Sequence, residues 1–226
     1  MSTLQVLYED NHLIVVNKPA GILVQADKTG DETLADQVKQ YLKRKYKKPG
    51  DVFLGTIHRL DRPVSGVVVF ARTSKALERM NKLFRDREVK KVYWALSRKR
   101  PPLEAGSLEN FILKNTKNNK AHIKSKEGKG AQKSFLEYEL KGRIAEYYLI
   151  EVKPETGRPH QIRVQLSHAG CPIVGDVKYG DPKGTRDKRI YLHSREISFV
   201  HPVKKEKLRV TAGLPNEQVW QMFKGI

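Results

Sequence analysis

Short apolar segments alternate with polar stretches near the start of the chain, as expected for successive β-strands. Residues 6–8 and 13–16 follow this pattern, and the polar stretch 9–11 between them predicts a turn. The continuous apolar run at residues 66–71 indicates a buried strand. Further strands are expected at residues 92–96, 135–140, 147–152 and 190–199.

Apolar residues recur at helical spacing in three places. The first helix is expected over residues 34–48, with Thr33 as its N-cap and a proline–glycine pair after its end. Ser74 is expected to cap a second helix that runs to about residue 84. Residues 159–168 predict a short third helix.

Many strands with few helices predict the α+β class, with a mixed, mostly antiparallel sheet and flanking helices. Residues 114–133 are polar and basic, which predicts either a long loop or an exposed hairpin. The chain holds no internal repeat and no long linker. Residues 1–226 are therefore expected to form a single domain, with a shallow cleft between two lobes.

Basic residues far outnumber acidic ones. The 226 residues include 44 Lys and Arg against 25 Asp and Glu, a formal net charge of +19. The excess is concentrated in two runs, residues 39–48 and 87–133. One run alone is typical of a solvated face, but two runs with this total charge indicate a polyanionic partner, because phosphate binding is mainly electrostatic. An anionic membrane surface is a weaker alternative, since no basic amphipathic helix with bulky aromatics is found.

Several classes of protein are not expected from this sequence. It has no apolar run of about 18 residues and no secretory signal, so neither a transmembrane helix nor export is expected. Cys171 is the only cysteine, which fits a reducing compartment and a cytoplasmic location. No glycine-rich nucleotide loop, His-Glu-x-x-His pattern or Cys-x-x-Cys pattern occurs. We therefore expect neither a metal ion nor an organic cofactor.

Asp61 is the first candidate for chemistry. It lies between Arg59 and Arg62, just before Pro63 and the buried strand at residues 66–71. Flanking cations favour the ionised carboxylate, and a fixed carboxylate can act as a nucleophile or a base. The plainer alternative is an aspartate that only caps the turn after Pro63.

A second candidate segment follows a predicted turn at residues 156–157. Arg158, His160, Gln161 and Arg163 come in quick succession at a possible helix start. Backbone donors and two guanidinium groups there would make an anion-binding cluster. The alternative is a surface helix with ordinary polar residues.

At these segments the sequence resembles the RluA-type pseudouridine synthases. The block His58-Arg-Leu-Asp-x-x-x-Ser-Gly is similar to the catalytic-aspartate motif of that family, although Pro63-Val64 stands where an Ala/Thr pair is more usual. Thr156-Gly-Arg-x-His-Gln-Ile-Arg, together with Gly170-x-Pro-Ile-x-Gly-Asp-x-x-Tyr-Gly, resembles the later family motif. Lys91-Val-Tyr-Trp-Ala resembles the block that supplies the active-site tyrosine of the family. Weaker similarity covers nearly the whole chain.

The resemblance implies a pseudouridine synthase fold with an RNA-binding cleft, and isomerisation of uridine in RNA without any cofactor. Asp61 would be the catalytic carboxylate, either attacking ribose carbon 1′ or abstracting the 2′ hydrogen to give a glycal. Arg163 would pair with Asp61, and Tyr93 would stack on the target base. Arg59 would fill the gap left by the extruded uridine, since the reacting atoms are inaccessible inside a helix.

The implied partner is a ribosomal or transfer RNA stem-loop, and a monomer is expected. The family pattern begins by Val6, so a preceding small RNA-binding domain is not expected. The rival hypothesis is a non-catalytic RNA-binding or ribosome-assembly protein on the same fold, but such a protein has no use for Asp61. The residues expected to contact RNA are Arg59, Arg62, Lys91, Arg158, His160 and Gln161.

Overall fold

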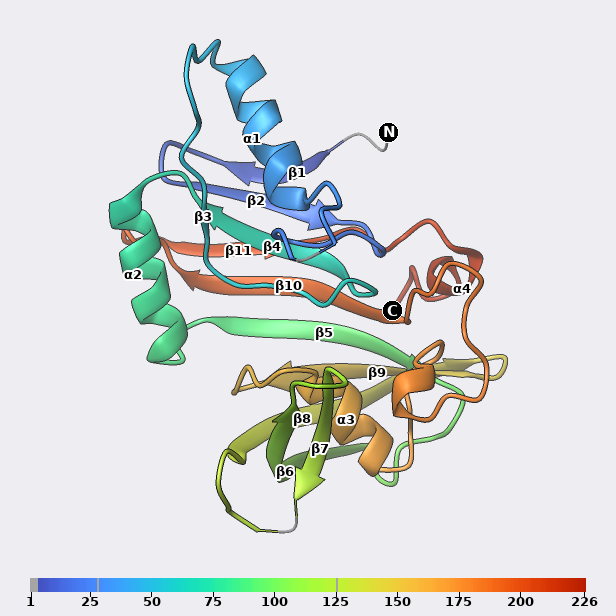
Figure 1. The fold of residues 1–226 in the computed structure, drawn as a ribbon. Coiled ribbons are helices and arrows are strands. Elements are labelled where there is room, and N and C mark those ends of the chain that lie inside the picture. Colours follow the sequence, from blue (N-terminus) through green and yellow to red (C-terminus); the bar gives the residue numbers. More distant parts are fainter. Residues whose placement is uncertain (1–3, 28, 125) are drawn as a thin grey trace. The chain divides into compact units, whose positions relative to one another are not determined.

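The computed structural model describes residues 4–27, 29–124 and 126–226 (Figure 1). Residue 125, within the predicted basic segment 114–133, lies outside the described residues. The chain divides into two compact units. The first comprises Met1–Val89 with Ser194–Gly213, and the second comprises Lys90–His193 with Leu214–Ile226. That residues 1–226 form one domain stays a prediction, as does the RNA-binding cleft.

The first unit is built on a sheet with the strand order β1-β2-β4-β10. Antiparallel pairing joins β1 to β2, β2 to β4, β3 to β4 and β10 to β11. The predicted strands at the start of the chain, at residues 66–71 and at residues 190–199 are confirmed. The strands are β1 (Gln5–Glu9), β2 (Leu13–Lys18), β3 (Gly55–Thr56), β4 (Ser65–Ala71), β10 (Leu192–Val200) and β11 (Lys207–Thr211).

Two helices belong to this unit, α1 (Leu34–Lys45) and α2 (Ser74–Arg85). Thr33 caps α1 as predicted, in a capping box: its hydroxyl accepts from the backbone N–H of Asp36, whose carboxylate accepts from the N–H of Thr33. The prediction that Ser74 caps α2 is wrong. Thr73 is the cap, because it has the extended backbone that an N-cap needs, whereas Ser74 is already helical.

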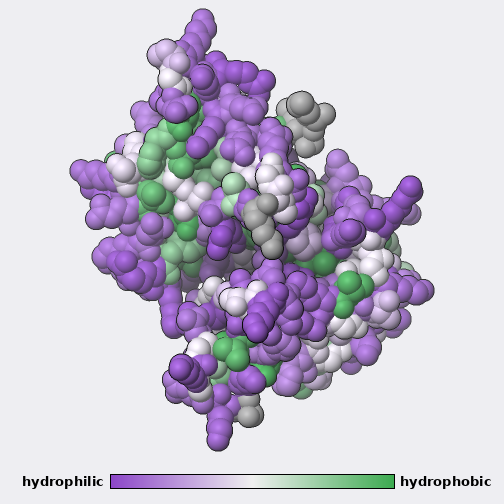
Figure 2. Space-filling view, viewed as in Figure 1, coloured by the Kyte–Doolittle hydropathy of each residue, from purple (hydrophilic) through white to green (hydrophobic). Residues whose placement is uncertain are grey.

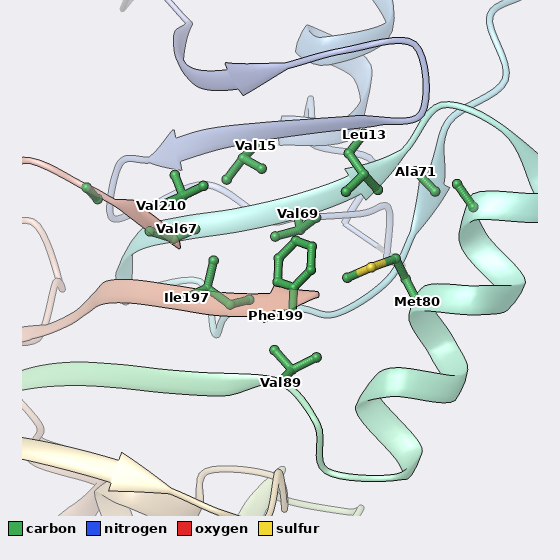
Figure 3. Close-up of a cluster of buried hydrophobic side chains, with 12 residues drawn as sticks. Leu13, Val15, Val67, Val69, Ala71, Met80, Val89, Ile197, Phe199 and Val210 are labelled. Carbon is green, nitrogen blue, oxygen red and sulfur yellow. The ribbon is translucent and has the colours of Figure 1, made fainter. Parts of the chain in front are cut away.

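Alternate residues of β2 and β4 form an apolar cluster against α2 (Figure 3). Their sequence neighbours point to the other face and are also buried. Burial on both faces explains why this part of the sequence is continuously apolar instead of alternating. The members from these three elements are Leu13, Val15, Val67, Val69, Ala71, Ala76 and Met80.

Gly66 lies near the start of β4, where the backbone approaches β10. Its φ is +117°, and a Cβ atom added there would lie 2.2 Å from the carbonyl oxygen of Ser194 and 2.5 Å from its nitrogen. Backbone atoms cannot yield as a flexible side chain can. The glycine that follows Asp61 by five positions is therefore required by the packing of β4 on β10.

The second unit contains a sheet with the strand order β5-β9-β8-β6-β7, in which each neighbouring pair is antiparallel. The helical elements are α3 (Gln161–His168), the 3-10 turn η1 (Val177–Tyr179) and α4 (Gln218–Gln221). The strands are β5 (Lys90–Ser97), β6 (Ala105–Asn115), β7 (Lys120–Lys124), β8 (Gln132–Ile144) and β9 (Tyr147–Pro154).

The predicted α+β class with a mostly antiparallel sheet is confirmed, as are the strands at 92–96, 135–140 and 147–152. Of the two alternatives for residues 114–133, the hairpin is found, made by β6 and β7. No helix among the described residues has the length and apolarity to cross a membrane. Hydrophilic side chains cover most of the face in Figure 2, as expected for a chain with 31% charged residues.

We predict that Gly66→Ala lowers the free energy of unfolding by about 3 kcal/mol, since it adds a backbone clash to a positive φ. Gly50→Ala is the matched control: nothing lies within 4 Å of the added Cβ, and its φ is not positive. The control should change stability by less than about 0.5 kcal/mol in urea denaturation. Equal stability of the two variants would contradict the packing argument.

Candidate active site

Asp61 is half-buried in the loop between β3 and β4. Its backbone carbonyl accepts from the N–H of Val64 at 3.0 Å, which closes the turn into β4. Lys18, at the end of β2, is completely buried and carries its ammonium group to this loop. The Lys18 Nζ donates to the carbonyl oxygens of Pro19 at 3.0 Å, Ile22 at 2.8 Å and Arg62 at 3.1 Å.

An ammonium group has three N–H donors, and these three carbonyls match them in number. Burial lowers the pKa of Lys18 from 10.5 to about 7, while the charge of Asp61 opposes this shift and that of Arg62 adds to it. The lysine therefore joins the loop after β2 to the loop that carries Asp61. It also places a cation within electrostatic range of the carboxylate.

The neighbours of Asp61 differ in their surroundings. Arg59 is exposed. Arg62 donates through Nε to the carbonyl of Gly21 at 2.9 Å and forms an exposed ion pair with Asp31 at 2.8 Å. Arg62 thus links two loops, and its contact with RNA stays a prediction.

His58 lies in the framework that supports the loop. Its ring stacks on Phe84 of α2 at a centroid distance of 5.1 Å, and its Nε2 accepts from the N–H of Val69 at 3.1 Å. These two contacts tie the Asp61 motif to α2 and β4. They indicate a structural role for His58.

Tyr93 and Lys91 lie in β5, in the second unit. Both are half-buried, and Tyr93 is in register with Val152 of β9. Burial lowers the pKa of Lys91. Because side chains on a strand alternate between faces, Lys91 and Tyr93 share one face of β5.

Arg163 lies on α3 and is bound by Asp176 in a bidentate ion pair. Its Nε is 2.7 Å from Oδ2, and its Nη2 is 2.9 Å from Oδ1. The side chains of Arg163 and Asp176 are only 7% and 1% exposed. Two parallel bonds hold the guanidinium plane in one orientation, which a single bond would not. The helix is not the surface helix of the alternative interpretation, since its residues 161–166 are all buried.

Tyr179 continues this cluster. Its ring lies 5.0 Å from the Arg163 guanidinium carbon, and its hydroxyl accepts from the N–H of Ala121 at 2.7 Å. The same hydroxyl bonds Nδ1 of His160 at 2.7 Å. His160 adopts a left-handed backbone, with φ of 54°, just before α3. The start of α3 is therefore tied to both η1 and β7.

Gln161 is used inside the protein. Its carbonyl oxygen accepts from the Thr156 hydroxyl at 2.8 Å and from the N–H of Arg158 at 3.0 Å, while its amide donates to Phe135 at 3.0 Å. Arg158 donates through Nε to the carbonyl of Lys133 at 3.0 Å. These bonds indicate structural roles. Contact of Gln161, Arg158 or His160 with RNA stays a prediction.

Three of these residues were missed as functional candidates in the sequence. Lys18 lies just past the predicted strand at residues 13–16, and a lysine at the end of an apolar run is a usable signal. Asp176 and Tyr179 belong to the glycine-containing part of the later family motif, but the resemblance gave neither of them a role. Only the fold shows that they hold Arg163.

The residues supply a carboxylate, a preorganised guanidinium and an aromatic phenol. Asp61 belongs to the first unit, while Tyr93 and Arg163 belong to the second. The pairing of Asp61 with Arg163 stays a prediction. Among the residues that the structure describes, no group of three His, Cys, Asp or Glu side chains could hold a metal ion.

The comparisons with known proteins agree on one family. A model of the family described as RNA pseudouridylate synthase matches residues 12–168. The matched region contains Asp61, Tyr93 and Arg163. A solved structure with a similar name also matches: that of Human RNA Pseudouridylate Synthase Domain Containing 4 has a TM-score of 0.80 and 26% identity, over 97% of this chain and 92% of that one.

Curated relatives extend this similarity along the chain. The tRNA pseudouridine synthase C of Haemophilus influenzae is 36% identical over 245 residues, covering 97% of this chain and 96% of that protein. The ribosomal large subunit pseudouridine synthase C of Buchnera aphidicola subsp. Schizaphis graminum is 35% identical, covering 92% of this chain and 67% of that protein.

The burial of Lys18 predicts a pH dependence of stability. Between pH about 7 and 10.5 the unfolded chain holds more of the Lys18 proton than the folded chain, so the free energy of unfolding rises with pH. Lys18→Met removes this titration. We therefore expect the wild type to gain stability relative to Lys18→Met across that window in urea denaturation. Lys39→Met, at an exposed lysine, is the control. Its difference from the wild type in free energy of unfolding should not change with pH. If the difference for Lys18→Met were equally independent of pH, the prediction would be contradicted.

Asp176→Asn should destabilise the protein by about 3 kcal/mol, because it removes the carboxylate charge that meets the buried Arg163 guanidinium in two bonds. Asp187→Asn serves as the matched control, since Asp187 pairs with Arg189 but its side chain is 44% exposed. The control substitution should lower the free energy of unfolding by less than about 1 kcal/mol. If urea denaturation gave the two variants the same midpoint, the buried pair would not be a main support of this unit.

Proposed function

The chain belongs to the RNA pseudouridylate synthase family, and from this membership we propose which residues carry out its reaction. The enzyme isomerises uridine in RNA to pseudouridine. The bond between ribose C1′ and base N1 breaks, the uracil turns, and a bond forms between C1′ and C5. C5 loses a proton and N1 gains one, so no oxidant or reductant is consumed.

Asp61 is the catalytic carboxylate in this proposal. The observation that carries it is the anchored loop: Lys18 holds the segment around Asp61 through the Arg62 carbonyl at 3.1 Å, and its protonated form adds a positive charge nearby. An ionised carboxylate in a fixed place can attack C1′ directly or abstract the 2′ hydrogen to give a glycal. Deuterium at C2′ separates these routes, since only the second breaks that bond.

Arg163 and Tyr93 complete the proposed site. Arg163 pairs with Asp61 and keeps it charged, and its orientation is supported by the two bonds to Asp176. A guanidinium stays protonated at any working pH, which suits this role. Tyr93 stacks on the target base and assists the removal of the proton from C5.

The target uridine is extruded from its stack, because its reacting atoms are inaccessible inside a helix. Arg59 is exposed, and we propose that it fills the vacated position. Arg62, Lys91 and Arg158 contribute positive charge to the RNA backbone contact. This arrangement relies on the basic surface of the chain to select a folded RNA.

The proposed substrate is a transfer RNA stem-loop. The chain covers 96% of a relative named tRNA pseudouridine synthase C, whereas it covers only 67% of a relative named ribosomal large subunit pseudouridine synthase C. A pseudouridine map of total RNA from cells with and without the gene tests this. Loss of signal in ribosomal RNA alone would overturn the choice. The monomeric state and cytoplasmic location stay predictions, for light scattering and cell fractionation.

We predict that Asp61→Asn lowers single-turnover pseudouridine formation by on the order of 10³-fold or more, because the essential carboxylate is lost. RNA affinity should be nearly unchanged, since phosphate contacts dominate affinity. Asp31→Asn, a nearby exposed carboxylate that pairs with Arg62, is the control and should keep substantial activity. Substantial activity of Asp61→Asn would refute the assignment.

A further inference from the structure

A hollow of about 490 Å³ lies in the second unit, between β7, the C-terminal half of α3, and η1. Lys120 and His122 of β7 line one side, Ser167 and His168 of α3 line another, and Lys178 of η1 closes the rim. We call this hollow the β7–α3 groove. Its volume is within the range of sites that hold a small molecule or one nucleotide.

The groove is positively charged. Two lysines and two histidines line it, and no acidic residue does. The two acids closest in sequence to η1 are engaged elsewhere: Asp176 binds Arg163, and Asp181 accepts from the N–H of Gly175 at 2.6 Å and pairs with Arg98 at 3.3 Å. Their charges are therefore partly neutralised within the protein.

The lysines are positioned without acidic partners. Lys178 Nζ donates to the backbone carbonyl of Asn119 at 3.1 Å, and Lys120 Nζ lies 5.7 Å from the centre of the Tyr179 ring. Within the described part of the chain, no salt bridge joins either lysine to a carboxylate. Ammonium groups without acidic partners at a concave surface favour the binding of an anion.

The rest of the lining suits a nucleotide chain better than an isolated anion. Val177 is 62% exposed beside the lysines, and it offers an apolar contact to a ribose or a base. His122 and His168 are exposed rings that can donate a hydrogen bond or stack on a base. The basic segment 114–133, of which residues 120–123 line the groove, contains seven lysines and a single glutamate.

The groove adjoins the proposed site without being part of it. Its floor includes Tyr179, the same ring that lies 5.0 Å from the guanidinium carbon of Arg163. Asp61, Tyr93 and Arg163 are absent from its lining. Only the Tyr179 side chain would therefore separate an RNA segment in the groove from Arg163, the proposed catalytic arginine.

We propose that the β7–α3 groove binds the phosphodiester backbone of the RNA substrate next to the modified uridine, with Lys120 and Lys178 as its phosphate contacts. This inference rests on the proposed function, since it takes the RNA substrate from it. It adds a second contact surface, separate from the residues that carry out the reaction.

The test compares Lys120→Gln/Lys178→Gln with Lys75→Gln/Lys207→Gln, in which two exposed lysines of the first unit are changed. Both variants remove the same total charge. A substrate stem-loop is titrated by fluorescence anisotropy over a series of KCl concentrations. The groove variant should bind the stem-loop on the order of tenfold more weakly at 0.1 M KCl. The slope of log affinity against log salt concentration should fall in magnitude by about 1 to 2.

The control variant should retain the wild-type affinity and slope. If both variants bind equally well, the groove proposal is overturned. A second titration uses inorganic phosphate and uridine monophosphate, followed by NMR of the histidine rings. If the groove variant loses only these small ligands and binds RNA as the wild type does, the groove is a site for a free phosphate, and the RNA proposal is also overturned.

Failure of the proposed function gives a different result. In that case the wild type would form no pseudouridine, or Asp61→Asn would remain active, whatever the groove variant does. Circular dichroism of both double variants shows that they are folded. The changed lysines are partly or fully exposed, so their replacement leaves the core intact.

Discussion

The buried ion pair between Arg163 and Asp176 constrains much of the second unit. An arginine that is 7% exposed is stable only if a carboxylate meets it with good geometry, because burying an unpaired charge costs several kcal/mol. The pair therefore fixes α3 against the segment that holds η1. Tyr179 of η1 then bonds His160 and the backbone of β7. One electrostatic requirement thus orders a helix, a turn and a hairpin.

The first unit also contains a buried cation, but backbone carbonyls and not a carboxylate accept its hydrogen bonds. Lys18 is buried and uses three carbonyl oxygens as acceptors, so it joins two loops in place of an ion pair. Gly66 adds a close backbone contact between β4 and β10 at the other side of the Asp61 turn. Asp61 is held between a charged anchor and a packing contact. Both contacts would need to break before its backbone could move far, which is preorganisation of a reactive group.

Most of the fold could be predicted from the sequence where one face or both faces of an element are apolar. Strands β1, β2, β4 and β10 and the helix capped by Thr33 are of this kind, whereas the short strands β3 and β11 were not predicted. Strand β6 was missed because only Ile112 along it is fully buried and its apolar residues 111–113 are consecutive, so its sequence shows no apolar–polar alternation. Thr73 and Ser74 both have the chemistry of an N-cap, and backbone angles alone distinguish them. Side-chain propensity cannot supply those angles.

The candidate site was predictable residue by residue, but its supports were not. The motifs name Asp61, Tyr93 and Arg163, whereas Lys18, Asp176 and Tyr179 act through contacts that only folding creates. Asp176 is 13 positions from Arg163 in sequence, and no local spacing rule joins them. A short motif therefore identifies groups for chemistry more readily than the residues that orient them.

Net charge has the same limitation as a guide to function. Part of the basic excess is used inside the protein: Lys45, from one of the two basic runs, binds Glu9 at 2.7 Å, and Arg98, from the other, pairs with Asp181. Counting lysines and arginines overstates the charge available to a partner. What matters for RNA is the set of cations without an acidic neighbour at a concave surface. By that criterion Lys120 and Lys178 are stronger candidates than Lys45, because binding RNA through them breaks no existing ion pair.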